Sequence, residues 1–190
     1  MGVVIVMNIT SSRKFPKAKS NSFTLVELLV VISIIGLLAG LGLPAINGAI
    51  QAGKKAEVAS MAESIKTAVN AFYAEYSQYP TNSSGITYTN TSSEFLGLMT
   101  TTTNTNGGNY RGIAFLEVPP KFTNASGIVT PNGFSTNKTN TFFVLIDTGG
   151  LGFVNPKSFS NTLTNSNVPS SVAVWVVDPK DAKKAVGTFK

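Results

Sequence analysis

The stretch SFTLVELLVVISIIGLLAGLGLP, residues 22–44, decides the fold of this chain because it is an apolar run of membrane-spanning length. The run continues to Ile46, and as an α-helix rising about 1.5 Å per residue it would reach about 36 Å. A hydrocarbon core is about 30 Å thick, so this segment is long enough to cross a membrane. No small-residue cleavage site of the A-x-A type follows it, as one would after the core of a secretory signal.

Glu27 is the one acidic residue in this run. A charged side chain in hydrocarbon costs about 2.5–3.5 kcal/mol on insertion scales and usually has a partner. The change from polar to apolar sequence falls between Ser22 and Phe23, and a cut there would place a new α-amino group one helical turn before Glu27. The amine and the carboxylate would then neutralise each other, within one subunit or between neighbours. Alternatively, the segment is a plain signal anchor whose acid stays hydrated at the membrane interface.

The residues SFTLVEL at positions 22–28, followed by an apolar run that Pro44 interrupts, resemble the leader junction of type IV pilins and type II secretion pseudopilins. The match is direct from Phe23 to Glu27, whereas Ser22 stands where the family usually has glycine. The resemblance implies that a prepilin peptidase removes residues 1–22 and that the Phe23 amine is N-methylated. It also implies assembly with other copies of the chain and with minor pilins at an inner-membrane platform.

Charge and composition agree with a membrane-inserted precursor. Before the apolar run lie four basic residues and no acid, and the positive-inside rule places this leader in the cytoplasm. From Phe23 onward there are 11 basic and 9 acidic residues, so nucleic-acid binding is not expected.

Met7 is an alternative start to Met1. The chain has neither cysteine nor histidine, which removes disulfides and the commonest general base and metal ligand.

Beyond Pro44 the pattern predicts more helix, to about residue 78, where Tyr79-Pro80 ends it. Apolar residues recur every three or four positions and form a single stripe that needs a packing partner. This stripe consists of Val58, Met61, Ile65, Val69, Phe72 and Tyr76.

The C-terminal part predicts a small antiparallel sheet, because β-branched and aromatic runs are separated by turn residues and no helical pattern intervenes. The predicted strands are 112–118, 141–146, a weaker 151–154, and 171–177, with a short helical turn at 93–99. Residues 180–190 are interpreted as a solvated basic tail. The predicted class is α+β, with the stripe packed on strand residues such as Phe115, Phe143, Leu145 and Trp175.

The expected organisation is therefore a leader at 1–22, a membrane-spanning or filament-core helix at 23–50, and an extracytoplasmic head at 51–190. Gly36 and Gly40 have the G-x-x-x-G spacing that lets helices approach closely in lipid, and Gly42 precedes Pro44. Glycine is also common in membrane helices in general, and for this spacing taken alone that is the preferred interpretation. We expect a kink at Pro44, because proline cannot donate to the carbonyl of Gly40.

Three aspartates, Asp147, Asp178 and Asp181, are candidates for a calcium site. Calcium needs about six to eight oxygen ligands, and lysines flank Asp178 and Asp181, so ordinary turns are the preferred interpretation.

No cofactor is expected. No nucleophile–base pair or phosphate-binding loop is visible, so the chain is not predicted to be an enzyme.

Two functions remain. The first is a structural subunit of a type IV pilus or a type II secretion pseudopilus, located in the bacterial inner membrane and in an extracytoplasmic filament. The second is a monomeric bitopic anchor with a ligand-binding extracytoplasmic head. Within the first, the segment Tyr76–Thr81 resembles pseudopilins, and the absence of a cysteine pair also favours them, whereas their calcium loop is not recognisable.

Overall fold

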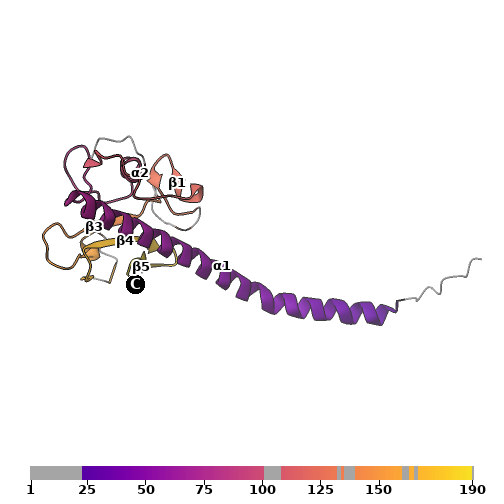
Figure 1. The fold of residues 1–190 in the computed structure, drawn as a ribbon. Coiled ribbons are helices and arrows are strands. Elements are labelled where there is room, and N and C mark those ends of the chain that lie inside the picture. The colour runs from indigo at the N-terminus through magenta and orange to yellow at the C-terminus, as the bar shows by residue number, and fades with distance from the viewer. Residues whose placement is uncertain are drawn as a thin grey trace, which may run out of the picture. The chain divides into compact units, whose positions relative to one another are not determined.

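The structure is a computed structural model that describes residues 23–100, 108–131, 134, 140–159, 163–164 and 167–189. The chain divides into two compact units at Ile46/Asn47. The described part of the first unit is Phe23, Thr24 and the long helix α1, Leu25–Tyr76, as far as Ile46. The second unit contains the rest of α1 and all other elements, and we call it the head (Figure 1).

The predicted long helix is confirmed, because α1 spans 52 residues without interruption. It ends where the backbone of Ser77 turns into the left-handed region, with φ of 54°. The N–H of Ser77 donates to the carbonyl of Tyr73 at 2.8 Å, which is the hydrogen bond of an αL C-terminal cap. Pro80 follows shortly after and prevents the helix from resuming.

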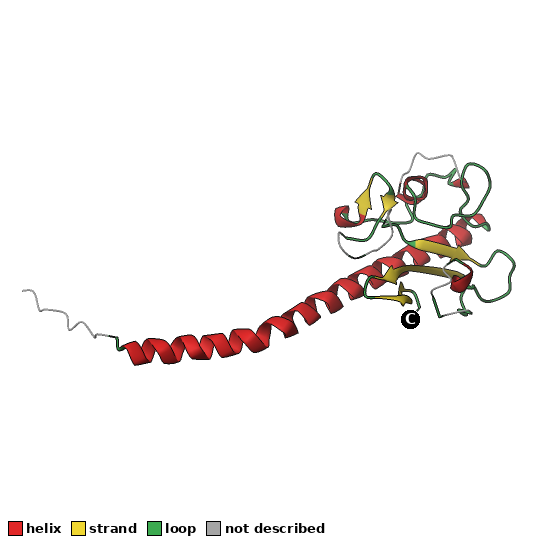
Figure 2. Cartoon of the chain, turned by 180° about the vertical axis from the view of Figure 1, so that it is seen from behind, coloured by secondary structure: helices red, strands yellow, loops and turns green. Residues whose placement is uncertain are grey.

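The head contains two small antiparallel sheets (Figure 2). The larger sheet has the order β3-β4-β5, formed by Phe143–Ile146, Val172–Asp178 and Asp181–Gly187. The smaller is a hairpin of β1, Thr123–Asn124, and β2, Gly127–Ile128. The remaining elements are the helix α2, Ser93–Thr100, and two short 3-10 helices, Pro120–Phe122 and Pro156–Ser158. The α+β class and the short helix near 93–99 are thereby confirmed.

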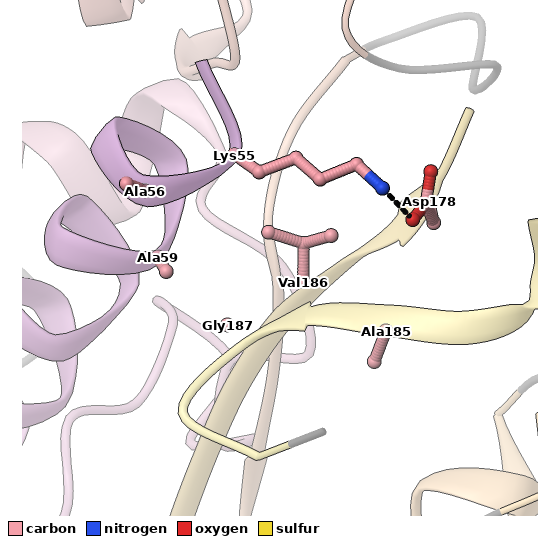
Figure 3. A pocket seen from close by; sticks show the side chains of 7 residues that line it. All are labelled: Lys55, Ala56, Ala59, Asp178, Ala185, Val186 and Gly187. Carbon is pink, nitrogen blue, oxygen red and sulfur yellow. Dashed lines mark hydrogen bonds and ion pairs between the residues drawn. The ribbon is translucent and has the colours of Figure 1, made fainter. Parts of the chain in front are cut away.

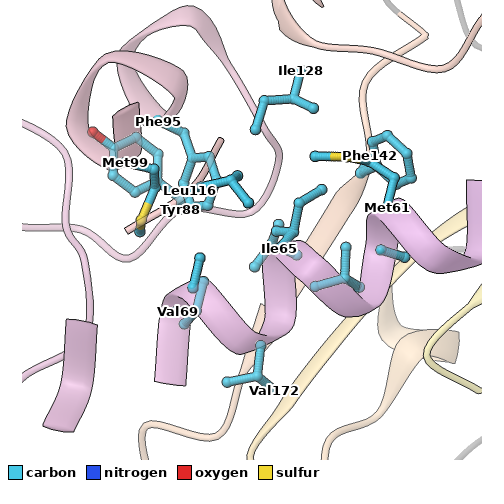
Figure 4. Close-up of a cluster of buried hydrophobic side chains, with 14 of the residues drawn as sticks. Met61, Ile65, Val69, Tyr88, Phe95, Met99, Leu116, Ile128, Phe142 and Val172 are labelled. Atoms are coloured by element: carbon cyan, nitrogen blue, oxygen red, sulfur yellow. The ribbon is translucent and has the colours of Figure 1, made fainter. Parts of the chain in front are cut away.

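The main core lies on the predicted stripe of α1, where Val58, Ile65, Val69 and Phe72 are fully buried. Figure 4 shows this stripe facing residues from α2, the β1–β2 hairpin and the sheet. Phe72 contacts the ring of Phe115 with centroids 5.3 Å apart, so this predicted contact is confirmed. The side chains that cover the stripe include Tyr88, Phe95, Met99, Leu116, Ile128, Phe142, Val144 and Val172.

The predicted packing of Phe143, Leu145 and Trp175 against the helix is wrong. Side chains alternate along a strand, and the residues that reach the helix core are the neighbours, such as Val144 and Val174. Phe143 and Trp175 are register partners on the opposite face, where their rings stack with centroids 5.5 Å apart. There they pack with Val154, Leu163 and Val168 in a second cluster. Both faces of the sheet are covered, which explains why both faces are apolar in sequence.

Three other predictions about the head need correction. Residues 112–118 are not a strand, because the N–H groups of Phe115 and Leu116 donate to the carbonyl of Met99 at the end of α2. Residues 151–154 contribute only an isolated bridge between Val154 and Val168. The basic tail is largely strand β5, whose Ala185 and Val186 are buried against its neighbours.

The head is expected to fold without the first half of α1, because its core begins at Val58 and no buried residue precedes it in the described chain. A chain starting at Gln51 should be soluble, monomeric and cooperative in thermal unfolding. Sedimentation and calorimetry measure these properties. Aggregation or the absence of a cooperative transition would contradict an independent head.

Candidate functional site

The first half of α1 presents an apolar surface that is unusual for a protein in water. Its large side chains between Leu25 and Ile50 are 45–78% exposed. By length and composition this is the one helix among the described residues that qualifies as a membrane span, and its apolar window is not buried within the structure. A surface of this extent is stable only in lipid or against other apolar helices.

Thr24 and Glu27 form the N-terminal cap of α1. One carboxylate oxygen of Glu27, Oε2, accepts from both the backbone N–H and the hydroxyl of Thr24, each at 2.8 Å. The N–H of Glu27 donates back to the Thr24 hydroxyl oxygen at 3.2 Å. This is a capping box, which satisfies backbone donors that the first turn of a helix leaves unpaired. The T-x-x-E spacing in the sequence signals this box, and our sequence interpretation missed it.

The Glu27 carboxylate can bind a further group in addition to Thr24. A carboxylate has two oxygens and about four acceptor positions, so the bonds to Thr24 do not exhaust it. A free amine on Phe23 would add positive charge beside the positive end of the helix dipole, and a carboxylate at this position would offset both. Neutralisation of an amine by Glu27 stays a prediction. Ser22 and the leader lie outside the described residues.

The Ser33 hydroxyl, a further polar group of the apolar run, has its hydrogen-bond partner within the helix. The hydroxyl of Ser33 donates to the carbonyl of Leu29 at 2.7 Å, so it does not require water or a neighbouring chain. Gly36, Gly40 and Gly42 have no atoms within 4 Å of an added Cβ, so each opens onto unoccupied space. Gly42 also lines a shallow apolar groove with Leu38 and Leu43. α1 is helical on both sides of Pro44, and the kink expected there stays a prediction.

The three aspartates form turns. The carboxylate of Asp147 accepts from the N–H groups of Leu151 and Gly152, and the Leu151 bond holds its pKa below the usual value. Asp178 and Asp181 oppose each other across the β4–β5 turn. Among the residues that the structure describes, no group of three acidic side chains could hold a metal ion.

Asp178 instead connects β4 to α1. Its Oδ2 accepts from the Lys55 ammonium at 2.5 Å, and its Oδ1 accepts from the N–H of Lys180 at 2.9 Å. Figure 3 shows this ion pair at the edge of a cavity of about 400 Å³ between α1 and the β4–β5 hairpin. Burial opposes ionisation of Asp178, but the hydrogen bonds from Lys55 and Lys180 outweigh it, so its pKa lies below the usual value.

This ion pair predicts a pH-dependent effect of the Lys55→Met substitution. At pH 7 the variant leaves a buried carboxylate without its cation, and we expect the free energy of unfolding to fall by about 1–3 kcal/mol. A carboxyl with a lowered folded-state pKa stabilises the protein above its unfolded pKa of about 3.9, and this contribution disappears as the pH falls through the folded value. The difference between the proteins should therefore shrink below about pH 4. Chemical denaturation measures it.

The matched control is Lys54→Met, since the ammonium of Lys54 is exposed and has no ion-pair partner among the described residues. It should change stability by no more than about 0.5 kcal/mol at any pH. Equal losses in the two variants would contradict a stabilising role for the Lys55–Asp178 pair.

Comparison with known proteins identifies the N-terminal segment. Residues 17–43 match the family model described as the prokaryotic N-terminal methylation motif. The chain is 39% identical over 77 residues to a fimbrial protein of Neisseria meningitidis serogroup B, covering 40% of this chain and 44% of that protein. It is 38% identical over 60 residues to the type IV major pilin protein PilE1 of Neisseria gonorrhoeae, covering 32% and 36%.

A further relative is the type IV major fimbrial protein FimA of Dichelobacter nodosus, 40% identical over 53 residues that cover 28% of this chain and 33% of FimA. The chain thus spans less than half the length of each of these relatives. The comparison with solved structures finds no significant match. The resemblance to the type IV pilin family is confirmed, and the named relatives are pilins and fimbrial proteins.

Proposed function

Because this chain carries the N-terminal motif of the type IV pilin family, we propose that it is a structural, non-enzymatic subunit of a type IV pilus. The precursor is inserted in the inner membrane with its leader in the cytoplasm and its head in the periplasm. A prepilin peptidase cuts between Ser22 and Phe23, and the new Phe23 amine is methylated. Subunits then leave the membrane at an assembly platform and join a filament.

The observation that carries this proposal is the exposed apolar first half of α1, which starts at a capped, charged end. The same helix surface suits two environments in turn. In the precursor it is surrounded by lipid, and in the filament it is surrounded by the corresponding helices of other copies. A helix of this kind moves between the two without exposing its apolar side chains to water.

A pilus is favoured over a secretion pseudopilus because the relatives named above are pilins and fimbrial proteins. The two features that favoured pseudopilins in the sequence are weaker evidence. Residues 76–80 form the end of α1 and the turn after it, and a Tyr-Pro pair suits any helix stop. The absence of cysteine excludes one kind of pilin loop without indicating a different assembly.

The first test is the mature N-terminus. We expect the N-terminal sequence of the membrane or filament protein to begin at Phe23. The mass of its N-terminal peptide should include one added methyl group. Ser22→Gly should process at least as fast, whereas Ser22→Trp should block processing because the residue before the cut must be small. A mature chain that begins at Met1 or Met7 would refute the proposal and favour a monomeric bitopic anchor.

A further inference from the structure

The carboxylates of the head are almost all neutralised or hydrogen-bonded within the described chain. Glu57 pairs with Lys121, Glu75 with Arg111, and Asp178 with Lys55. Glu94 accepts from the N–H of Ser83, and the two other aspartates accept from turn N–H groups. Glu63 and Glu117 are the exceptions, because both are exposed and neither has a hydrogen-bond or ion-pair partner among the described residues.

These two carboxylates border the same groove. It has a volume of about 460 Å³ and runs between the exposed face of α1 and the segment 115–117. Its α1 side is made of small side chains, including Ser60, Ser64 and Ala71, which let another chain approach closely. Lys66 follows Glu63 by one turn of α1 but forms no ion pair with it among the described contacts. The groove therefore presents uncompensated negative charge.

The β4–β5 turn carries the opposite charge. Lys180 lies in the turn and Lys183 follows on β5, and both side chains are exposed. Their ammonium groups have no ion-pair partner among the described residues, whereas the neighbouring Lys184 pairs with Asp181. The turn thus projects two free cations.

The groove and the turn lie on opposite flanks of α1. Glu57 and Glu75 are five helical turns apart on one side of α1, and they pair with Lys121 and Arg111, which lie on either side of the segment 115–117 in the chain. Lys55 precedes Glu57 by two residues, which places it about 200° around the helix. Lys55 pairs with Asp178 at the base of the turn, so the turn lies on the other flank. One molecule cannot bring its own turn into its own groove across the helix.

We propose that the groove bordered by Glu63 and Glu117 receives the β4–β5 turn of a second copy of this chain, through Lys180 and Lys183. The contact joins different surfaces of two identical molecules, and such a heterologous contact repeats from copy to copy instead of closing into a dimer. It would order the heads beside one another while the apolar helices bundle. The inference rests on the proposed filament function and adds the surfaces by which heads meet.

Charge reversal tests the contact in the full-length protein. The double variant Glu63→Lys with Glu117→Lys should lower the yield of sheared filaments about tenfold, because like charges would meet across the interface. Lys180→Glu with Lys183→Glu should give a similar loss. Combining all four substitutions restores opposite charges and should recover most of the yield. The control is Lys157→Glu. Lys157 is exposed and adjoins Ser158, which lines a pocket with Ile146 and Asp147 at the end of the sheet opposite the β4–β5 turn, and this variant should assemble normally.

Two results would overturn the proposal while the filament function stands. In the first, the wild-type chain makes filaments and neither reversal lowers their yield. In the second, the reversals lower the yield but the combination does not restore it, which would assign the groove to a different basic partner. Protease resistance of each variant's head identifies losses that come from misfolding.

Crosslinking gives a readout that does not depend on charge reversal. The chain has no cysteine, so Ser64→Cys with Ala182→Cys introduces the sole thiols, and the exposed Ala182 lies beside Lys183 on β5, so both lysines of the contact are kept. A short bifunctional maleimide should link successive copies into a ladder in filaments, and into dimers in membranes. Ser64→Cys with Lys157→Cys should give no ladder. If the wild type makes no filaments, the proposed pilus function is wrong. In that case the groove contact is tested by the crosslinked dimer in membranes, and absence of this dimer would overturn the contact.

Discussion

Filaments are expected to disappear, or to fall below about a tenth of the wild-type amount, when Glu27 is replaced by valine. The physical reason is that the Phe23 amine of the processed chain would enter an apolar helix bundle without a carboxylate to neutralise it. Insertion of the precursor should be unimpaired, because the substitution removes a charge that costs about 2.5–3.5 kcal/mol in lipid. Shearing and quantitative immunoblotting measure the filaments, and membrane fractionation measures insertion.

Glu27→Gln separates the two roles that the structure allows for this residue. Glutamine keeps the acceptor oxygen that binds the N–H and hydroxyl of Thr24, so it preserves the capping box. It lacks the negative charge. If neutralisation of the amine is the function, Gln should fail almost as completely as Val. Normal filaments with Gln and none with Val would show that helix capping is the essential contribution.

The second large effect is expected in the head, where Phe72→Ala should lower the free energy of unfolding by about 3–5 kcal/mol. Phe72 is fully buried and contacts the rings of Phe115 and Tyr76, with centroids 5.3 and 4.6 Å apart. Alanine would leave a cavity between α1 and the segment around Phe115. Denaturation of the head by urea measures the loss.

Tyr73→Ala is the matched control, since Tyr73 is the next residue of α1 but is 46% exposed. Its ring stacks on Tyr79 with centroids 4.5 Å apart, and losing such a pair should cost about 0.5–1.5 kcal/mol. Similar losses in the two variants would mean that the stripe does not form the main core of the head.

The features that could be predicted from sequence are those with a clear period or an extreme composition. The apolar run has an extreme composition and the stripe from Val58 to Tyr76 follows a helical repeat, and together they predicted the 52-residue helix α1 close to its observed bounds. The SFTLVEL junction resembles that of the type IV pilins, and the comparisons confirm this resemblance. In each case the signal is local, so no knowledge of distant contacts was needed.

The errors arise where a tertiary contact decides the structure. Val144 and Leu145 are equally apolar, and the sequence does not say which of them meets the helix when both faces of the sheet are covered. β5 contains two lysines and resembles a solvated tail, yet pairing with β4 makes it a strand. Residues 112–118 have strand composition, but they bind the end of α2 instead of another strand. The Lys55–Asp178 pair joins residues too far apart for any local pattern to reveal.

That separation also determines when the head can fold. Lys55 and Asp178 are 123 residues apart, and the strands that cover the stripe of α1 come late in the chain. Contacts between such distant segments form slowly, because a long loop must close before they contribute any stability. During synthesis, α1 emerges with Val58, Ile65 and Phe72 uncovered, and their cover is complete only when β4 and β5 have been made, because Val174 and Val186 are also part of this core. The newly made stripe is therefore an aggregation-prone part of this protein, and chaperones should bind it between Val58 and Tyr76 before the sheet is complete.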